Sequence, residues 1–265
     1  MKKDATKKIL SKKSGRLIFA ALVAVFFFVG LLAVYNLIST EREYSIAQSE
    51  YAELRQWVPP PPSPPAGNSS TAESSESTTE QDPEPEPEPV PFPDFTSFNP
   101  DYIGWIRIGG TDIDYPVVQG KDNLKYLNVT FMGERNSSGA IFLDSNCSSG
   151  FTGLALLHGH NMNNGTMFAG LHSFRDSDFL SRNNEINIFT PEGEMLTYSI
   201  FDVKITTAND AIFNLPAEGQ EAFTRYFNRY GLDGHSIKDH SGILALSTCT
   251  SGPRNERLVV FAARQ

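Results

Sequence analysis

The sequence has few cysteines and no surplus of positive charge. Only two of its 265 residues are cysteines, Cys147 and Cys249, and neither belongs to a Cys-x-x-Cys pair. This excludes a disulfide-rich scaffold and argues against a thiolate zinc site. The formal net charge is −9, and residues 107–265 hold 13 bases against 17 acids. A nucleic-acid-binding domain concentrates basic residues on its folded part, so we expect no nucleic-acid partner.

The chain also lacks internal repeats, a glycine-rich phosphate-binding loop and a paired-carboxylate motif. These absences leave little support for a solenoid, a nucleotide-binding enzyme or a two-carboxylate hydrolase.

A long apolar run near the N-terminus predicts a membrane anchor. Residues 17–38 carry no charge, and residues 2–16 are rich in lysine. As a helix the run is roughly 33 Å long, against a hydrocarbon core of about 30 Å. A cleaved signal peptide has a shorter apolar stretch followed by small residues, and the run is apolar all round, unlike most soluble helices. We expect a cytoplasmic tail over 1–16, a single span over 17–38 and the rest of the chain outside.

Two segments follow the predicted span. Residues 39–58 begin with Thr40 and Glu43, which resemble a capping box, and continue with apolar residues spaced by three and four. This pattern predicts a short juxtamembrane helix. Residues 59–94 include 12 of the 17 prolines together with Ser, Thr and Glu. Such a segment cannot bury a core, so we expect a disordered, semi-rigid spacer.

The folded domain is expected over residues 95–265, and we expect a fragment starting near residue 95 to fold alone and keep its activity. Eight short β-type runs lie in this region, separated by turn signals, and helical patterning is limited to 167–180 and 218–230. Eight strands with two inserted helices predict a mainly β fold, either a closed barrel or a sandwich. The expected strands are 102–108, 113–119, 140–144, 152–158, 185–190, 195–207, 242–249 and 257–263.

The candidate chemistry centres on Cys249, which ends the apolar run GILALSTC. A buried, inert thiol is the commoner state of such a residue. A reactive thiolate needs an imidazole partner and often a nearby cation. Arg254 and Arg257 follow Cys249, and the segment HGHNM supplies His158 and His160.

The remaining histidines and the second cysteine have less suggestive surroundings. We expect the histidines to be surface residues and Cys147, in the polar segment DSNCSSG, to be a bystander. The histidines concerned are His172, His235 and His240.

Several segments together resemble sortases, the cysteine transpeptidases of Gram-positive cell surfaces. LSTC at 246–249, followed by Arg257 opening RLVVFA, is similar to the sortase signature. NPDYIGWIRIGGTDIDYPVVQG from residue 99, GAIFLDSN at 139–146 and LLHGHNMNNGTMF at 156–168 resemble segments of class B members. The resemblance covers residues 99–263, and the helical pattern at 218–230 is similar to the helical insertion of class B.

This resemblance implies a closed eight-stranded barrel with a short N-terminal helix and a helical insertion before the cysteine strand. It implies Cys249 as nucleophile, His160 as catalytic histidine and Arg257 as the transition-state cation, with Arg254 as the alternative cation. It further implies groove residues that bind the sorting signal: Asn128, Thr207, Ile212 and Ser247.

The implied reaction needs no metal or organic cofactor. Cys249 would cleave the C-terminal sorting signal of a surface protein after Thr, in an Asn-Pro-x-Thr- or Pro-Pro-x-Thr-type motif. His160 would protonate the leaving amine and then accept a proton from an acceptor amine of a peptidoglycan precursor or cross-bridge. The product would be a surface protein anchored to the cell wall.

Other functions stay open at this point. Some class B sortases polymerise pilins, and a secreted cysteine protease would use the same residues with water as acceptor. An L,D-transpeptidase places His-Gly before its cysteine, where this chain has Ser247 and Thr248. A membrane-tethered adhesin with an inert thiol is the alternative outside the enzymes.

Overall fold

The computed structural model describes residues 2–60, 92–148, 150–214, 228 and 242–265. The chain divides into two compact units, Met1–Ala47 and Gln48–Gln265. Most of the predicted spacer at 59–94 lies outside the described residues. So does the predicted helix at 218–230, apart from Asn228.

The N-terminal unit belongs to one long helix, α1 (Lys2–Arg55). By length and composition, α1 is the one helix among the described residues that could cross a membrane, over a segment within Phe19–Arg55. The expected junction near residue 39 is absent, and the capping-box prediction is wrong. Thr40 lies inside α1, where its hydroxyl donates to the carbonyl of Asn36 at 3.0 Å. Because the preceding turn already satisfies the backbone there, the side chain bonds back along the helix instead of capping it.

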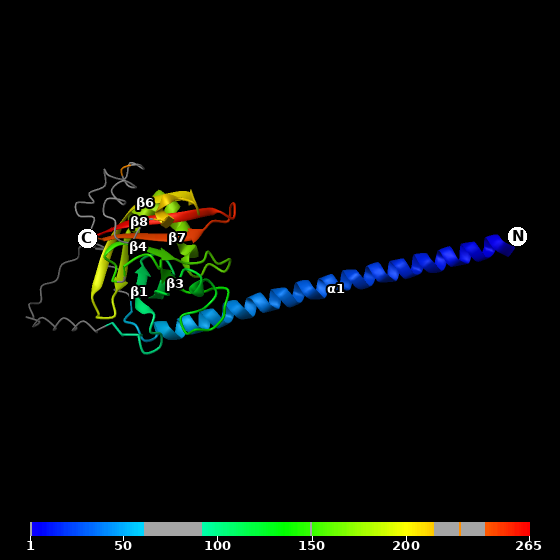
Figure 1. Ribbon diagram of the computed structural model, residues 1–265, viewed down its shortest axis with the longest axis horizontal. Coiled ribbons are helices and arrows are strands. Elements are labelled where there is room, and N and C mark those ends of the chain that lie inside the picture. The colour runs from blue at the N-terminus through cyan, green and yellow to red at the C-terminus, as the bar shows by residue number, and fades with distance from the viewer. Residues whose placement is uncertain (1, 61–91, 149, 215–227, 229–241) are drawn as a thin grey trace, which may run out of the picture. The chain divides into compact units, whose positions relative to one another are not determined.

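The second unit is a closed barrel of eight strands in the order β1-β2-β3-β4-β7-β8-β6-β5 (Figure 1). This confirms the mainly β class and decides for a barrel over a sandwich. The strands are β1 (Tyr102–Ile108), β2 (Asp114–Val118), β3 (Ile141–Leu143), β4 (Gly153–His158), β5 (Glu185–Phe189), β6 (Met195–Thr207), β7 (Gly242–Cys249) and β8 (Glu256–Arg264). All eight lie within one or two residues of the predicted strands, because each carries a short apolar run bounded by turn residues.

Short helical segments connect the strands. They are η1 (Lys125–Leu127), η2 (Phe168–Arg175), α2 (Ser177–Arg182) and η3 (Ala211–Asn214). The helical pattern predicted at 167–180 is thus two elements. Asp176 separates them and caps α2, since its carboxylate accepts from the N–H of Phe179 at 2.9 Å.

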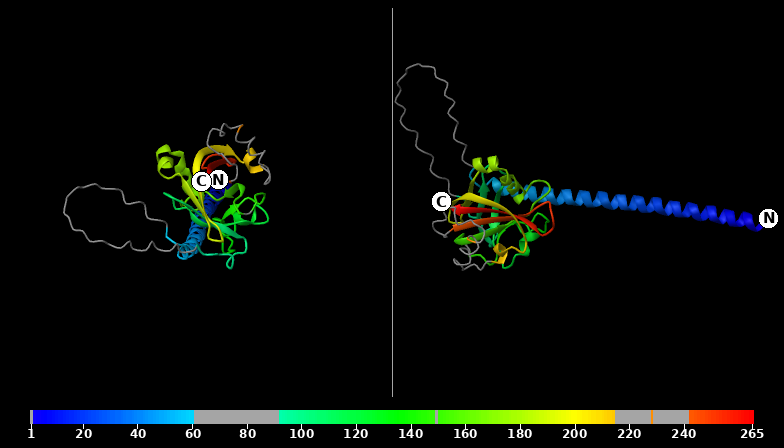
Figure 2. Two further views of the ribbon diagram at one scale, coloured as in Figure 1. Left: turned by 90° about the vertical axis from the view of Figure 1, so that its left-hand side faces the viewer. Right: turned by 90° about the horizontal axis from the view of Figure 1, so that it is seen from above.

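Strand β7 lies between β4, to which it is parallel, and β8, to which it is antiparallel. Strand β8 pairs with β6 on its other side, and Figure 2 shows the red, orange and yellow strands side by side. Every residue of β7 except Cys249 is buried. A strand covered on both faces loses the polar–apolar alternation of a half-exposed strand, which explains the unbroken run GILALS.

The end of α1 belongs to the barrel unit. Tyr51 is 3% exposed, its hydroxyl donates to the carbonyl of Gly139 at 2.7 Å, and its ring packs edge-on against Tyr115. Arg55 donates from Nε to the carbonyl of Asp114 at 2.8 Å. Leu54, Val58 and Phe92 are buried as well. We expected the folded domain to begin near residue 95, whereas the compact unit begins at Gln48, because apolar side chains before the spacer pack on the barrel.

These contacts make the N-terminal boundary of a soluble fragment testable. A fragment starting at residue 48 should unfold at a higher temperature and urea concentration than one starting at residue 95. The reason is that each fully buried large apolar side chain contributes about 1.5–3 kcal/mol. Within the longer fragment, Tyr51→Phe should cost about 1 kcal/mol for the lost hydrogen bond and Tyr51→Ala about 3–5 kcal/mol. Equal stability of the two fragments would show that this segment contributes nothing to the fold.

Candidate active site

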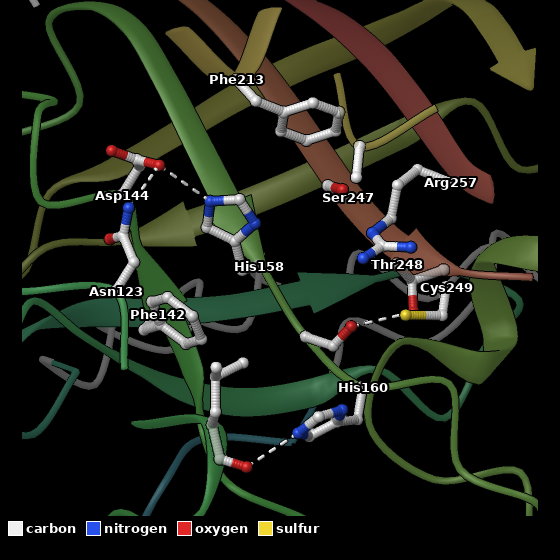
Figure 3. A pocket seen from close by; sticks show the side chains of 13 residues that line it. Asn123, Phe142, Asp144, His158, His160, Phe213, Ser247, Thr248, Cys249 and Arg257 are labelled. Carbon is white, nitrogen blue, oxygen red and sulfur yellow. Dashed lines mark hydrogen bonds and ion pairs between the residues drawn. The ribbon is translucent and has the colours of Figure 1, made fainter. Parts of the chain in front are cut away.

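A cavity of about 280 Å³ opens where β4, β7 and β8 come together (Figure 3). Its walls bring together side chains from six separate parts of the chain. The lining residues are Asn123, Leu127, Phe142, Asp144, His158, Gly159, His160, Ala208, Phe213, Ser247, Thr248, Cys249 and Arg257.

Strand register places four of the candidate side chains on one face. Ser247 is the partner of His158 in β4, and Cys249 is the partner of Arg257 in β8. Because side chains alternate along a strand, Ser247 and Cys249 point to the same side, together with their partners on the flanking strands. Further along the same face the residues are apolar and form a core cluster: Leu154, Leu156, Ile243, Ala245, Val259 and Phe261. The cavity is therefore the polar end of an otherwise apolar face.

His160 reaches the cavity because β4 ends at His158 and the chain turns at Gly159. A side chain at Gly159 would collide with Ile141 and Phe168, within 2.5–2.7 Å, so only glycine fits at this turn. Nε2 of His160 then lies 2.8 Å from the carbonyl oxygen of Leu127. A carbonyl oxygen only accepts, so Nε2 carries the hydrogen, and Nδ1 is the nitrogen that can gain or lose a proton.

The two arginines differ in position as the sequence predicted. Arg257 is half-buried and lines the cavity, whereas Arg254 is exposed in the loop before β8. The Nη1 group of Arg257 donates to the carbonyls of Arg254 at 3.0 Å and of Glu256 at 2.9 Å. Among the described residues no carboxylate pairs with Arg257, so its positive charge stays available to an anion in the cavity.

Cys249 has a partly exposed, unpaired thiol at the end of β7. Figure 3 draws it between Arg257 and His160, with all three side chains at the same cavity. Its carbonyl accepts a hydrogen bond of 3.1 Å from Nε2 of His172. The prediction that His172 is a surface residue is wrong, because η2 packs against the ends of β7 and β8 and half-buries it. His235 and His240 lie outside the described residues.

Cys147 lies in different surroundings from Cys249. Its sulfur accepts the N–H of Leu156 at 3.5 Å, and the side chain packs against the apolar cluster of β4, β7 and β8. Burial raises the pKa of Cys147 to about 11, so little of it is thiolate at neutral pH. The polar residues that flank Cys147 gave no indication that its side chain packs against apolar residues.

His158 is paired with a carboxylate that sequence reasoning did not single out. Nε2 of His158 lies 3.0 Å from Oδ2 of Asp144, and Nδ2 of Asn123 donates to the same oxygen at 2.8 Å. Burial raises the pKa of Asp144, but hydrogen bonds from His158, the N–H of Asn146 and Asn123 outweigh it, so this pKa lies below its usual value. The signal for Asp144 was its position, directly after the apolar run of β3.

The predicted groove residues have mixed positions. Ser247 lines the cavity, whereas Asn128 and Thr207 are exposed beside it and Ile212 is buried in the apolar cluster of β4, β7 and β8. The cavity is lined instead by their direct neighbours, Leu127, Ala208 and Phe213. Leu127 ends η1, Ala208 follows β6 and Phe213 lies within η3, so local turns rather than strand alternation direct these side chains.

The cavity thus combines a thiol, a cation and two imidazoles, and a thiol with one imidazole and one cation is sufficient for covalent acyl transfer through a thioester. Among the described residues, no three His, Cys, Asp or Glu side chains converge as a metal site would require.

Comparison with known proteins identifies the family of the chain. Residues 106–265 match the sortase domain family. The sortase B of Staphylococcus aureus is 29% identical to the chain over 181 residues, which are 64% of this chain and 73% of that protein.

Solved structures that resemble the chain are sortases as well. The sortase B of Clostridium perfringens is 35% identical, with a TM-score of 0.59 over 64% of this chain and 97% of that one. A class B sortase of Streptococcus pyogenes involved in pilus biogenesis is 31% identical, with a TM-score of 0.57 over 65% and 96%. The chain therefore belongs to the sortase family of cysteine transpeptidases and to its class B.

Proposed function

We propose that the protein is a membrane-anchored transpeptidase that joins surface proteins to the cell wall through a thioester on Cys249. The observation that carries this proposal is the register of β7 and β8. It pairs Cys249 with Arg257 at a cavity that His160 also lines. The buried and inert alternative for Cys249 is disfavoured, since its thiol borders open space beside a cation.

The first half of the proposed reaction forms the thioester. The Cys249 thiolate attacks the carbonyl carbon of Thr in the sorting signal, and the C–N bond to the next residue breaks. His160 as imidazolium gives its Nδ1 proton to the leaving amine. Arg257 stabilises the negative charge that develops on the carbonyl oxygen, because a guanidinium stays charged and offers two parallel donors.

The second half transfers the acyl group. An amine of a peptidoglycan precursor or cross-bridge attacks the thioester carbon, the C–S bond breaks and Cys249 leaves as thiolate. His160, now neutral, accepts one proton of the attacking nitrogen. We infer that Ser247 contacts the bound sorting signal, because it lines the cavity two residues before Cys249 on the same face.

The proposed topology is a single pass with the N-terminus in the cytoplasm and the catalytic domain outside. Its support is the lysine-rich segment before the apolar stretch of α1, since basic residues stay on the cytoplasmic side. The spacer at 59–94 does not set the distance between barrel and membrane in this proposal, because Val58 before it and Phe92 near its end are both buried in the barrel unit.

A second candidate is pilin polymerisation, in which the acceptor is a lysine of another pilin subunit. The observation that favours it is the similarity to the Streptococcus pyogenes class B sortase involved in pilus biogenesis. If water instead of an amine is the acceptor, the same residues make a cysteine protease. Mass spectrometry of the products with an added amine separates these outcomes, because only transfer leaves the amine attached to the Thr carbonyl.

The first prediction concerns the nucleophile. Full-length protein in detergent, incubated with a sorting-signal peptide, should gain the mass of the acyl fragment on one cysteine. Cys249→Ala should lose this adduct completely, whereas Cys147→Ala should keep it, because Cys147 is buried with a raised pKa. An adduct in the Cys249→Ala protein would contradict the assignment.

The second prediction concerns the two histidines. His160→Ala should abolish thioester formation, because the leaving amine then lacks its acid. His158→Ala should still form the thioester at a rate within a few fold of the unaltered protein. The measurement is the adduct formed per unit time in rapid-quench samples. Normal adduct formation in His160→Ala together with none in His158→Ala would exchange the two roles.

The third prediction concerns the cation. Arg257→Ala should lower turnover by roughly 10²–10³-fold, about 2.7–4 kcal/mol, as for other oxyanion donors. Arg257→Lys should also lose much of the turnover, since an ammonium group lacks the two parallel N–H donors of a planar guanidinium. The matched control is Arg254→Ala, which should stay within a few fold because Arg254 is exposed. Nearly full activity in Arg257→Lys with a crippled Arg254→Ala would transfer the role to Arg254.

A further inference from the structure

The cavity contains a second imidazole that the proposed thioester chemistry leaves unused. His158 has a side chain 21% exposed, and its partner Asp144 has one 6% exposed. Both oxygens of Asp144 are occupied: Oδ2 by His158 and Asn123, and Oδ1 by the N–H of Asn146 at 2.9 Å. The carboxylate is therefore nearly buried and already engaged by three donors, one of which is His158.

The ring of His158 is held in one orientation. A carboxylate accepts, so Nε2 carries the hydrogen and Nδ1 is the unprotonated nitrogen of the neutral ring. In Figure 3 this second nitrogen points away from Asp144, toward the open part of the cavity. The rings of Phe142 and Phe213 lie against the imidazole at 5.1 and 6.2 Å between centroids. An imidazole with a carboxylate on one nitrogen and a cavity on the other is the arrangement of a general base.

His158 is also within reach of the reacting carbon. It pairs with Ser247, two residues before Cys249. A strand spacing of about 4.8 Å and a rise of about 3.3 Å per residue put the Cα atoms of His158 and Cys249 roughly 8 Å apart. An amine attacking an acyl group on Cys249 fits between the thiol and the imidazole.

The chemistry of an amine acceptor requires a second base. An alkyl amine is an ammonium ion at neutral pH, and with a pKa of about 10.4 only about one molecule in 2,500 is uncharged. The ammonium must lose one proton before attack and another as the amide forms. His160 can take only one of them, since it has given one proton to the leaving amine.

We propose that His158, oriented by Asp144, is the base that removes the first proton from the acceptor ammonium. The inference rests on the proposed function and deepens it. In the complete step the ammonium gives one proton to Nδ1 of His158 and becomes a neutral amine. Its nitrogen then forms the bond to the thioester carbon, the C–S bond breaks with the electron pair on Cys249, and the second proton goes to His160. His158 as imidazolium is stabilised by Asp144 and returns its proton to solvent.

The charges around His158 agree with this role. The other titratable or charged residues lining the cavity are Asp144, His160, Cys249 and Arg257, and Asp144 is the one in hydrogen-bond contact with His158 among the described residues. The transfer moves the positive charge from the ammonium to His158 without changing the net charge of the cavity, and the hydrogen bond from Nε2 to Asp144 is kept in the imidazolium that results.

The test compares acceptors that differ in charge. Full-length protein in detergent is first loaded with the acyl group, and the thioester is verified by mass spectrometry. It is then mixed at neutral pH with a lysine-type amine, with an oligoglycine or with hydroxylamine, which is uncharged at this pH. The variants are His158→Gln, which can still donate to Asp144, and Asp144→Asn, with Arg254→Ala as an exposed control. Melting temperatures verify that each variant is folded.

Both variants should slow capture by the lysine-type amine at least tenfold. Capture by the oligoglycine should slow by a smaller factor. Capture by hydroxylamine and hydrolysis by water should each slow less than twofold. Equal slowing of all acceptors and of hydrolysis would mean that the pair only supports the structure, and would overturn the proposal. Unchanged capture of the lysine-type amine in both variants would overturn it as well. Absence of a thioester in the unaltered protein is a separate result, which would overturn the proposed function and this inference together.

Discussion

The site depends on the pairing of β7 with β4 on one side and β8 on the other. One parallel and one antiparallel ladder fix the register of three strands, and side-chain alternation then brings Cys249, Arg257 and His158 to one face. Slipping β7 by one residue would turn Cys249 to the opposite face and break the apolar cluster that continues from it. The burial of that cluster therefore stabilises the register on which the chemistry depends.

The reactive groups are held mainly by main-chain carbonyls. The carbonyl of Leu127 holds His160, the carbonyls of Arg254 and Glu256 hold Arg257, and His172 donates to the carbonyl of Cys249. A neutral carbonyl orients a side chain without cancelling its charge, so the positive charge of Arg257 stays available for the role proposed for it. Asp144, the carboxylate that lines the cavity, contacts His158 instead of Arg257 or His160. The two imidazoles therefore have different partners, a carboxylate for His158 and a main-chain carbonyl for His160, although they are two residues apart.

Helix α1 has two kinds of surroundings along its length. Its apolar stretch has exposed side chains on all sides, such as Phe26, Phe27 and Phe28, as a membrane-crossing segment requires. Its last two turns bury Tyr51 and Leu54 against the barrel. The folded unit therefore includes residues that precede the proline-rich segment, although composition alone changes abruptly at residue 59.

The sequence by itself determined the eight strands, the apolar span and the candidates Cys249, His160 and Arg257, because apolar alternation, turn residues and short motifs are local properties. Only the tertiary structure decided which side chains meet. It put Leu127, Ala208 and Phe213 at the cavity in place of Asn128, Thr207 and Ile212, and it brought Asp144 to His158 and His172 to Cys249. Most of these positions lie in short 3₁₀ helices or at strand ends, where the direction of a side chain depends on contacts with segments distant in the chain. Local sequence patterns do not encode such long-range contacts, so they cannot predict them.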